Sequence, residues 1–169
     1  IEPITRVGRE IRMLEPFYLP GAAYQYRQLQ RAGKLDWDLA SIVAPNGALL
    51  FALDLDYSPD PVERVFRFGP PREARFDFDL PSYLRHPRDV FRVEADGIVE
   101  VRHELTERGV RIEDRANKVA IYVATKDPDL RKQLEARRRE LRDCEQSFRF
   151  SPADSDADFA TLNAIPLGK

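Results

Sequence analysis

The sequence predicts a mostly β domain, an antiparallel β-sandwich of about eight strands with a helical segment before it and an amphipathic helix after it. Three observations support this fold class. Between residues 38 and 125, apolar side chains tend to alternate with polar ones, as they do on half-buried strands. Turn signals rich in Pro, Gly, Asn and Asp separate these runs. No helix-length pattern lies between them, which argues against a parallel sheet with crossover helices.

Residues 1–36 are predicted to form an N-terminal helix and a linker. The apolar residues at helical spacing are Ile4, Val7, Ile11 and Leu14. Pro16 is expected to limit this helix, because the residue before a proline is pushed out of the α region. The stretch from Tyr24 to Ala32 fits no single pattern, since an aromatic alternation gives way to a polar run.

Residues 37–126 are predicted to form the sandwich. Asn46-Gly47 is its strongest hairpin signal, because both residues tolerate the positive φ of primed turns, and Asp96-Gly97 is a second. The nearly continuous apolar run Ala48–Leu53 indicates a central strand covered on both faces. The expected strands are Leu39–Ala44, Ala48–Tyr57, Val62–Phe68, Arg75–Leu80, Val90–Val93, Val99–Leu105, Val110–Ile112 and Lys118–Thr125.

Residues 127–169 are predicted to form a C-terminal helix and a tail packed on the sandwich. Asp127 suits the N-cap and Pro128 the first helical position. One side of this helix is apolar, with Leu130, Leu134, Leu141, Cys144 and Phe148.

The tail carries Asp154, Asp156 and Asp158 and then an apolar patch, which together suggest a short helix that folds back. The patch consists of Phe159, Leu162 and Ile165. The three aspartates imitate the start of a calcium loop, but Phe159 stands at the obligatory glycine and Ile165 at the bidentate glutamate. We therefore expect no metal site there.

Composition excludes several classes of protein. The 169 residues carry a net charge of -2, from 27 Lys+Arg against 29 Asp+Glu, so no nucleic-acid partner is expected. A single cysteine rules out an internal disulfide and multi-cysteine zinc sites. No apolar run approaches the roughly 18 residues of a membrane span. The start Ile1-Glu2-Pro3 lacks an initiator Met and a signal sequence, so we expect a piece of a larger protein.

Few residues suit catalysis, and we assign no catalytic residue and no cofactor. Asp54 and Asp56 share a strand face and could act as an acid/base pair, but a solvated strand end is the favoured interpretation. His103 is expected to lie in the core or at its rim, and Cys144 to pack as a small hydrophobic side chain. A hydrolase using Asp54, Asp56 and His86 is the least favoured hypothesis.

Aromatic residues suggest a ligand instead. Trp37 and several tyrosines, including Tyr24 and Tyr26, could form a platform for sugar rings, with aspartates bonding the hydroxyl groups. The candidate ligand-binding residues are Trp37, Tyr57, Tyr83, Asp54 and Asp56. A polysaccharide is accordingly a candidate partner.

Three segments carry a resemblance to a known family: residues 44–57 with their Pro-Asn-Gly turn, residues 89–97 with Asp-Gly, and residues 109–123. The order of elements from Ile4 to Thr125 resembles the C-terminal β-sandwich accessory domain of multidomain glycoside hydrolases, such as α-amylase-like and galactosidase-like enzymes. In those enzymes the catalytic residues belong to a barrel that this chain lacks. The charged helix after Asp127 departs from their pattern.

The resemblance implies a non-catalytic accessory module of a larger carbohydrate-active or cell-surface protein. Such a module would stabilise or position a neighbouring domain of the same polypeptide, with weak glycan binding as a further expectation, and an extracytoplasmic location is slightly favoured. The alternative hypothesis is a protein–protein interaction or dimerisation module. Its seam would be Leu134, Leu141 and Phe148 at heptad spacing on the C-terminal helix.

Overall fold

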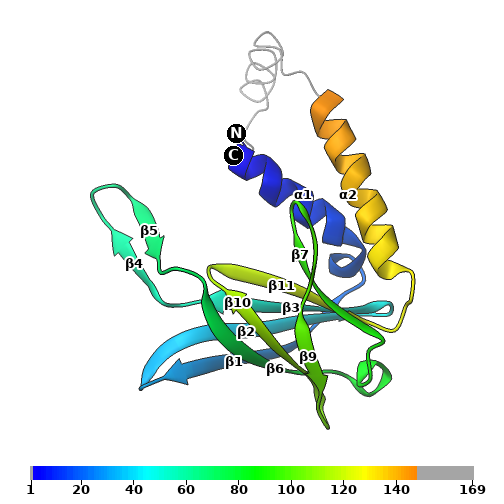
Figure 1. The fold of residues 1–169 in the computed structure, drawn as a ribbon, viewed down its shortest axis with the longest axis horizontal. Coiled ribbons are helices and arrows are strands. Elements are labelled where there is room, and N and C mark those ends of the chain that lie inside the picture. The colour runs from blue at the N-terminus through cyan, green and yellow to red at the C-terminus, as the bar shows by residue number, and fades with distance from the viewer. Residues whose placement is uncertain (1, 148–169) are drawn as a thin grey trace, which may run out of the picture.

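The computed structural model describes residues 2–147, and these form the predicted antiparallel β-sandwich with a helix at each end (Figure 1). The strands build a six-stranded sheet in the order β1-β2-β3-β11-β7-β8, a three-stranded sheet β6-β10-β9, and a separate hairpin β4-β5. In chain order the elements are α1 (Glu2–Tyr18), β1 (Ala22–Arg31), β2 (Lys34–Ala44), β3 (Gly47–Asp54), β4 (Tyr57–Asp60), β5 (Val65–Phe68), β6 (Arg72–Asp79), a 3-10 turn η1 (Ser82–Leu84), β7 (Asp89–Glu94), β8 (Gly97–Glu100), β9 (Arg102–Leu105), β10 (Gly109–Ala116), β11 (Val119–Thr125) and α2 (Leu130–Ser147).

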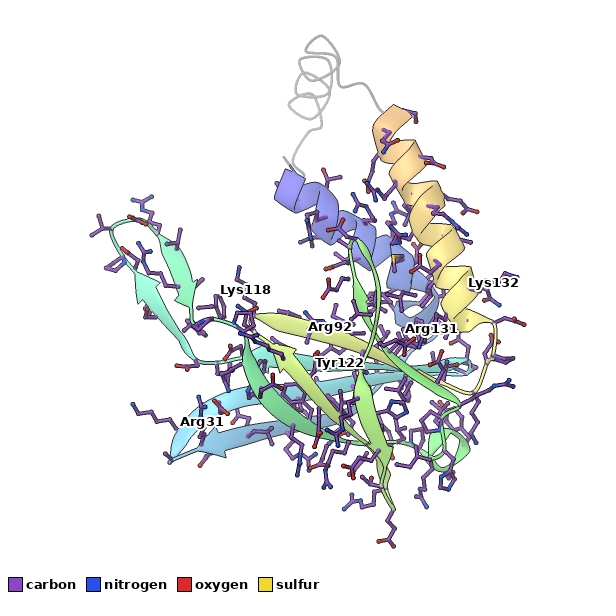
Figure 2. The ribbon with its side chains drawn as sticks, in the orientation of Figure 1. Arg31, Arg92, Lys118, Tyr122, Arg131 and Lys132 are labelled. Carbon is purple, nitrogen blue, oxygen red and sulfur yellow. The ribbon has the colours of Figure 1, made fainter. Side chains whose placement is uncertain are left out.

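The main core lies between the six-stranded and three-stranded sheets. Trp37 packs edge-on against Phe76, with ring centroids 4.9 Å apart. Tyr122 is fully buried beside them, and its hydroxyl donates to Asp114 at 2.9 Å; Arg92 donates to the same carboxylate at 3.0 Å (Figure 2). Burial and the Asp114 charge raise the pKa of Tyr122, so this phenol stays a donor.

A second core lies on the other face of the six-stranded sheet, under the two helices. The helices contribute Met13, Leu14, Phe17, Leu130 and Leu134. The sheet contributes Ala44, Leu49, Phe91, Val93 and Val123. Because β3 and β11 are sandwiched between both cores, their sequences are apolar at nearly every position, as predicted for central strands.

The described chain has more strands than the sequence predicted: the N-terminal helix is present as α1, but the residues after it, expected as a linker, include a strand. Residues 22–31 form β1, an edge strand of the six-stranded sheet. The sequence did not predict it because an edge strand with exposed alternate residues carries little apolar signal. Residues 57–60, expected as a strand end and loop, form β4, and the expected strand Val99–Leu105 divides at Val101, where the chain passes between sheets.

The sequence predicted a primed turn at Asn46-Gly47, but in the structure this type of turn occurs at another hairpin. Ala44 pairs with Gly47, so Pro45 and Asn46 make the turn between β2 and β3, and proline holds a negative φ. Among the described residues, the hairpin turn with two consecutive positive φ values is Ala32 (50°) and Gly33 (78°), between β1 and β2. This is the pattern of a type I′ turn.

α1 continues past Pro16 to Tyr18, contrary to the prediction that the proline limits it. A proline inside a helix has no N–H to donate to the carbonyl four residues earlier, which here belongs to Arg12. The side chain of Arg137 on α2 donates to that carbonyl at 2.9 Å. The second helix therefore satisfies the acceptor that Pro16 leaves free.

We expect Gly33→Ala to lower the free energy of unfolding by about 1 kcal/mol, because an L-residue is disfavoured at positive φ. A Cβ at Gly33 would meet nothing within 4 Å, so the cost is conformational. Gly97→Ala is the matched control, since its Cβ also meets nothing within 4 Å and its φ is not in the positive region. Urea unfolding measures both; an equal effect of the two substitutions contradicts the turn assignment.

Candidate functional site: the open face of the large sheet

The outer face of the six-stranded sheet is only partly covered by the helices. Antiparallel pairing aligns its outward side chains in rows across the strands. One row, Ile42, Leu49, Val123 and Phe91, belongs to the core under α1 and α2. The next row is Tyr26, Ala40, Phe51 and Ile121, and the last is Gln28, Asp38, Leu53 and Val119.

Several side chains of the last two rows are exposed to solvent. Tyr26 is 66% exposed, Leu53 38% and Val119 52%, whereas Leu49, Phe91 and Val123 of the first row are buried. We call the surface formed by Tyr26, Gln28, Asp38, Leu53 and Val119 the open face. It combines flat apolar area with polar groups on adjacent strands.

Polar groups on the open face converge on Asp38. Its Oδ1 accepts hydrogen bonds from the Tyr26 hydroxyl at 3.2 Å and from Gln28 Nε2 at 3.0 Å. Partial desolvation, together with the hydrogen bond to Asp38 and its negative charge, raises the pKa of Tyr26, so the phenol remains protonated at neutral pH. Oδ2 of Asp38 accepts no hydrogen bond from the described residues and can bond a ligand.

The open face is bordered on one side by a hollow beneath α1. This hollow, about 240 Å³, is lined by Val119 and Ile121 of the sheet, by Arg6 and Glu10 of α1, and by residues 92–94 of β7. The β4–β5 hairpin extends away from the end of β3 that carries Leu53 (Figure 1). We call it the arm.

The arm is held together by aromatic side chains. The ring of Tyr57 lies 5.1 Å from that of Phe66 and 5.5 Å from that of Phe68. Phe66 is 66% exposed, so the arm presents an apolar surface of its own. A hollow of about 320 Å³ at its base is lined by residues 56–58 and 67–69.

Two of the predicted ligand-binding residues are buried. Trp37 is only 1% exposed and belongs to the sandwich core, so the prediction that it contacts a ligand is wrong. Asp54 is buried too, and its Oδ1 accepts from Arg72 at 2.8 Å. The guanidinium of Arg72 also contacts Asp36 at 2.9 Å and lies 4.6 Å from the Trp37 ring.

Arg72 therefore closes this end of the sandwich. Burial acts to lower the pKa of Arg72, but its hydrogen bonds and ion pairs with Asp54 and Asp36 outweigh burial, and the pKa lies above its ordinary value. The Asp54 carboxylate is committed to this structural ion pair.

Asp56 and Tyr57, in contrast, are accessible. The Asp56 side chain is 66% exposed and lies 3.7 Å from Arg31. It lines both the hollow at the base of the arm and a second one, of about 410 Å³, beside the β1–β2 turn. Tyr57 is 44% exposed. These two predicted residues lie near the open face and are available to a ligand.

Tyr83 lies at the opposite end of the sandwich. Its hydroxyl donates to the carbonyl of Ala44 at 3.0 Å, and Ala44 is seven residues along β2 from Trp37, roughly 23 Å away. His86 follows Tyr83 in the same loop, so it does not meet Asp54 and Asp56. The five predicted residues thus do not form one site.

Two further predictions need correction. His103 is exposed, not in the core: it pairs with the buried Ile112, but β9 is an edge strand and all four of its residues are exposed. Cys144 is exposed near the end of α2, where the helix has moved away from the sheet. The calcium-like aspartates 154, 156 and 158 lie outside the described residues.

The central residue of the open face, Asp38, was not among the predicted site residues. The signal was present in Trp37-Asp38, where a buried Trp37 places Asp38 on the opposite face. Within residues 2–147, no cluster of three or more His, Cys, Asp and Glu side chains is arranged to hold a metal ion. None of the described helices is long and apolar enough to cross a membrane.

Comparison with known proteins gives no relative. No family model matches the chain, and no curated protein or solved structure matches it significantly.

Arg72→Gln is expected to lower the free energy of unfolding by roughly 2 kcal/mol or more, because it leaves the buried Asp54 carboxylate without its cation. Arg67→Gln is the matched control: Arg67 pairs with Asp60 and Glu63, but its side chain is 55% exposed. We expect no measurable change for it. Urea unfolding compares the two variants; equal stability would contradict the structural role of Arg72.

Proposed function

We propose that this chain is a non-catalytic accessory module of a larger carbohydrate-active or cell-surface protein and that it binds a polysaccharide on the open face. The single observation that carries the proposal is the group Tyr26, Gln28 and Asp38. There an exposed aromatic side chain, an amide and a carboxylate are held together on adjacent strands.

The chemistry of these groups suits a sugar. The apolar face of a sugar ring packs on aromatic and aliphatic side chains, here Tyr26, Leu53 and Val119. Its hydroxyl groups both donate and accept hydrogen bonds, which matches the free Oδ2 of Asp38 and the amide of Gln28. The four strands of the outermost row span about 14 Å, enough for an extended chain to lie across them.

Binding without catalysis is the interpretation that these groups favour. The open face, as defined by its five residues, has one carboxylate, Asp38, and its neighbours donate hydrogen bonds to it. General acid–base chemistry on a glycosidic bond needs two carboxyl groups on opposite sides of that bond. Asp54 does not supply the second, because it is paired with Arg72.

The relation to a neighbouring domain and the extracytoplasmic location remain predictions from the resemblance. The dimerisation alternative is weakened on one point. Leu134, the first of its three seam positions, is buried, and Leu141 packs partly against the same core. Phe148, the third position, lies outside the described residues.

We expect Tyr26→Ala to weaken binding to a polysaccharide retained by the wild-type chain by about tenfold or more, a change readily measured as a dissociation constant. A polysaccharide pull-down and glycan screen identifies that ligand, and calorimetric titration quantifies the change. Tyr83→Ala is the matched control, because Tyr83 is 46% exposed at the far end of the sandwich. An equal loss in both variants, or a blank screen with folded wild-type chain, contradicts the proposal.

A further inference from the structure

The two helices pack closely at one end and separate toward the other (Figure 1). Their buried side chains lie at the packed end: Met13, Leu14 and Phe17 of α1, and Leu130 and Leu134 of α2. Toward the start of α1, the apolar side chains of Ile4, Val7 and Ile11 are exposed. The helix pair therefore leaves apolar side chains uncovered at this end.

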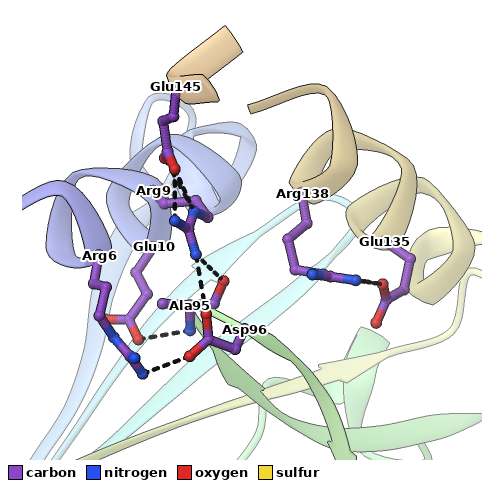
Figure 3. Close-up of polar contacts among 8 residues, drawn as sticks. All are labelled: Arg6, Arg9, Glu10, Ala95, Asp96, Glu135, Arg138 and Glu145. Atoms are coloured by element: carbon purple, nitrogen blue, oxygen red, sulfur yellow. Dashed lines mark hydrogen bonds and ion pairs between the residues drawn. The ribbon is translucent and has the colours of Figure 1, made fainter. Parts of the chain in front are cut away.

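A polar bridge spans the base of this opening (Figure 3). Arg9 donates through Nε to Glu145 Oε1 at 3.0 Å and through a terminal nitrogen to the carbonyl of Ala95 at 2.9 Å. The hydrogen bond to Glu145 raises the pKa of Arg9 above its ordinary value despite partial burial. The Arg9 side chain is only 9% exposed. Because Arg9 belongs to α1 and Glu145 to α2, their ion pair holds the two helices together.

Above the bridge lies an apolar groove of about 420 Å³, which we call the helix groove. Its walls are Thr5, Gly8, Ile11 and Arg12 of α1 and Leu141 and Cys144 of α2, with the Arg9–Glu145 pair at its base. Ile11 is 53% exposed, and a Cβ added at Gly8 would meet nothing within 4 Å. The groove is thus accessible apolar surface with space beside it.

We propose that residues 148–169 of the same chain bind in the helix groove, with Phe159, Leu162 and Ile165 packed against Ile11 and Leu141. The segment starts directly after Ser147, four residues beyond a wall residue of the groove, Cys144. The eleven residues before Phe159 in this segment can span up to about 37 Å when extended, so the apolar patch that begins at Phe159 can reach the groove.

The sequence of this segment complements the groove in apolar pattern. Phe159, Leu162 and Ile165 recur at three-residue spacing, which places them on one side of a short helix. Burying two or three such side chains removes their apolar surface from water and so favours the bound segment. An apolar stripe of this size fits a groove whose accessible walls are Ile11 and Leu141.

The charges are complementary as well. Asp154, Asp156 and Asp158 precede the apolar patch. Near the groove, the Arg12 side chain is 66% exposed and its ion pair with Glu15 is long, at 3.5 Å. Arg139 and Arg142 of α2 are exposed and form no ion pair with a described residue. Acidic groups beside these arginines would favour the bound segment.

The single cysteine provides a native probe, because Cys144 lines the groove and would be covered by the bound segment. We expect Phe159→Asp in the full chain to raise the rate of Cys144 modification by a thiol reagent by about tenfold or more, since a buried carboxylate opposes docking. Ala164→Asp is the matched control: on a helix it lies on the side away from Phe159, Leu162 and Ile165, so it should leave the rate unchanged.

Ile11→Asp tests the same contact from the groove and guards against a local effect of one variant. It should raise the modification rate as Phe159→Asp does, with unchanged circular dichroism. Equal rates in wild type, Phe159→Asp and Ile11→Asp would overturn the proposal. So would protection of Cys144 that rises with protein concentration, because a second copy of the chain would then be the occupant.

Discussion

The structure depends on covering both faces of one six-stranded sheet. β3 and β11 at its centre are apolar on both sides, and such strands are stable only when each face is removed from water. The three-stranded sheet covers the inner face, with Trp37, Phe76 and Tyr122 filling the space between. Two helices cover the outer face, but they lie over one part of it. The remaining part, with Tyr26 and Leu53, faces solvent and is the surface that we connect with binding.

Arginine side chains determine where the helices lie. Arg131 of α2 donates to Asp89 of β7 at 2.9 Å and also pairs with Glu100 of β8; the pKa of Arg131 rises, chiefly through its hydrogen bond to Asp89. Its guanidinium also lies 4.7 Å from the ring centroid of Phe91. Glu135 accepts from the backbone N–H of Ile98 at 3.2 Å, so α2 also covers the free edge of β8.

α1 is fixed at the same side of the sheet. Arg6 pairs with Asp96 at 2.6 Å, and Glu10 accepts from the N–H of Ala95 at 2.9 Å, so α1 is held to the β7–β8 turn (Figure 3). Both helices are thereby drawn toward β7 and β8, away from β1. The open face and the helix groove are two consequences of this one arrangement: the first is sheet left uncovered, and the second is the space where the helices separate.

Local patterns in the sequence predicted the elements that depend on the order of apolar and polar residues within one segment. The alternation around Phe76 and Phe78, the apolar run of β11 and the last helix all correspond to elements that formed, although this helix begins at Leu130 and not at Pro128. β1 was not predicted, because its pairing with β2, and not its own apolar content, makes it a strand. The open face could not be predicted, because it depends on contacts such as Arg9–Glu145, between residues 136 positions apart.

Only part of the candidate site was predicted, because it too depends on contacts between residues far apart in the sequence. Asp56 and Tyr57 are accessible, as their position at a strand end suggested. Trp37 instead lies in the core, and Asp54 belongs to a structural ion pair. The sequence alone does not distinguish an aromatic side chain that faces a ligand from one that faces the protein interior. Only the alternation of Trp37 and Asp38, combined with knowledge of which face is buried, assigns Asp38 to the surface.

The most direct test of the central claim is an NMR titration of the full chain with soluble fragments of a polysaccharide that it retains. Our account predicts that the largest amide shift changes fall on Tyr26, Gln28, Asp38, Leu53 and Val119, in rows across adjacent strands. Changes centred on the loop of Tyr83 and His86, or on the helix groove, would show that the uncovered part of the sheet is not the binding surface.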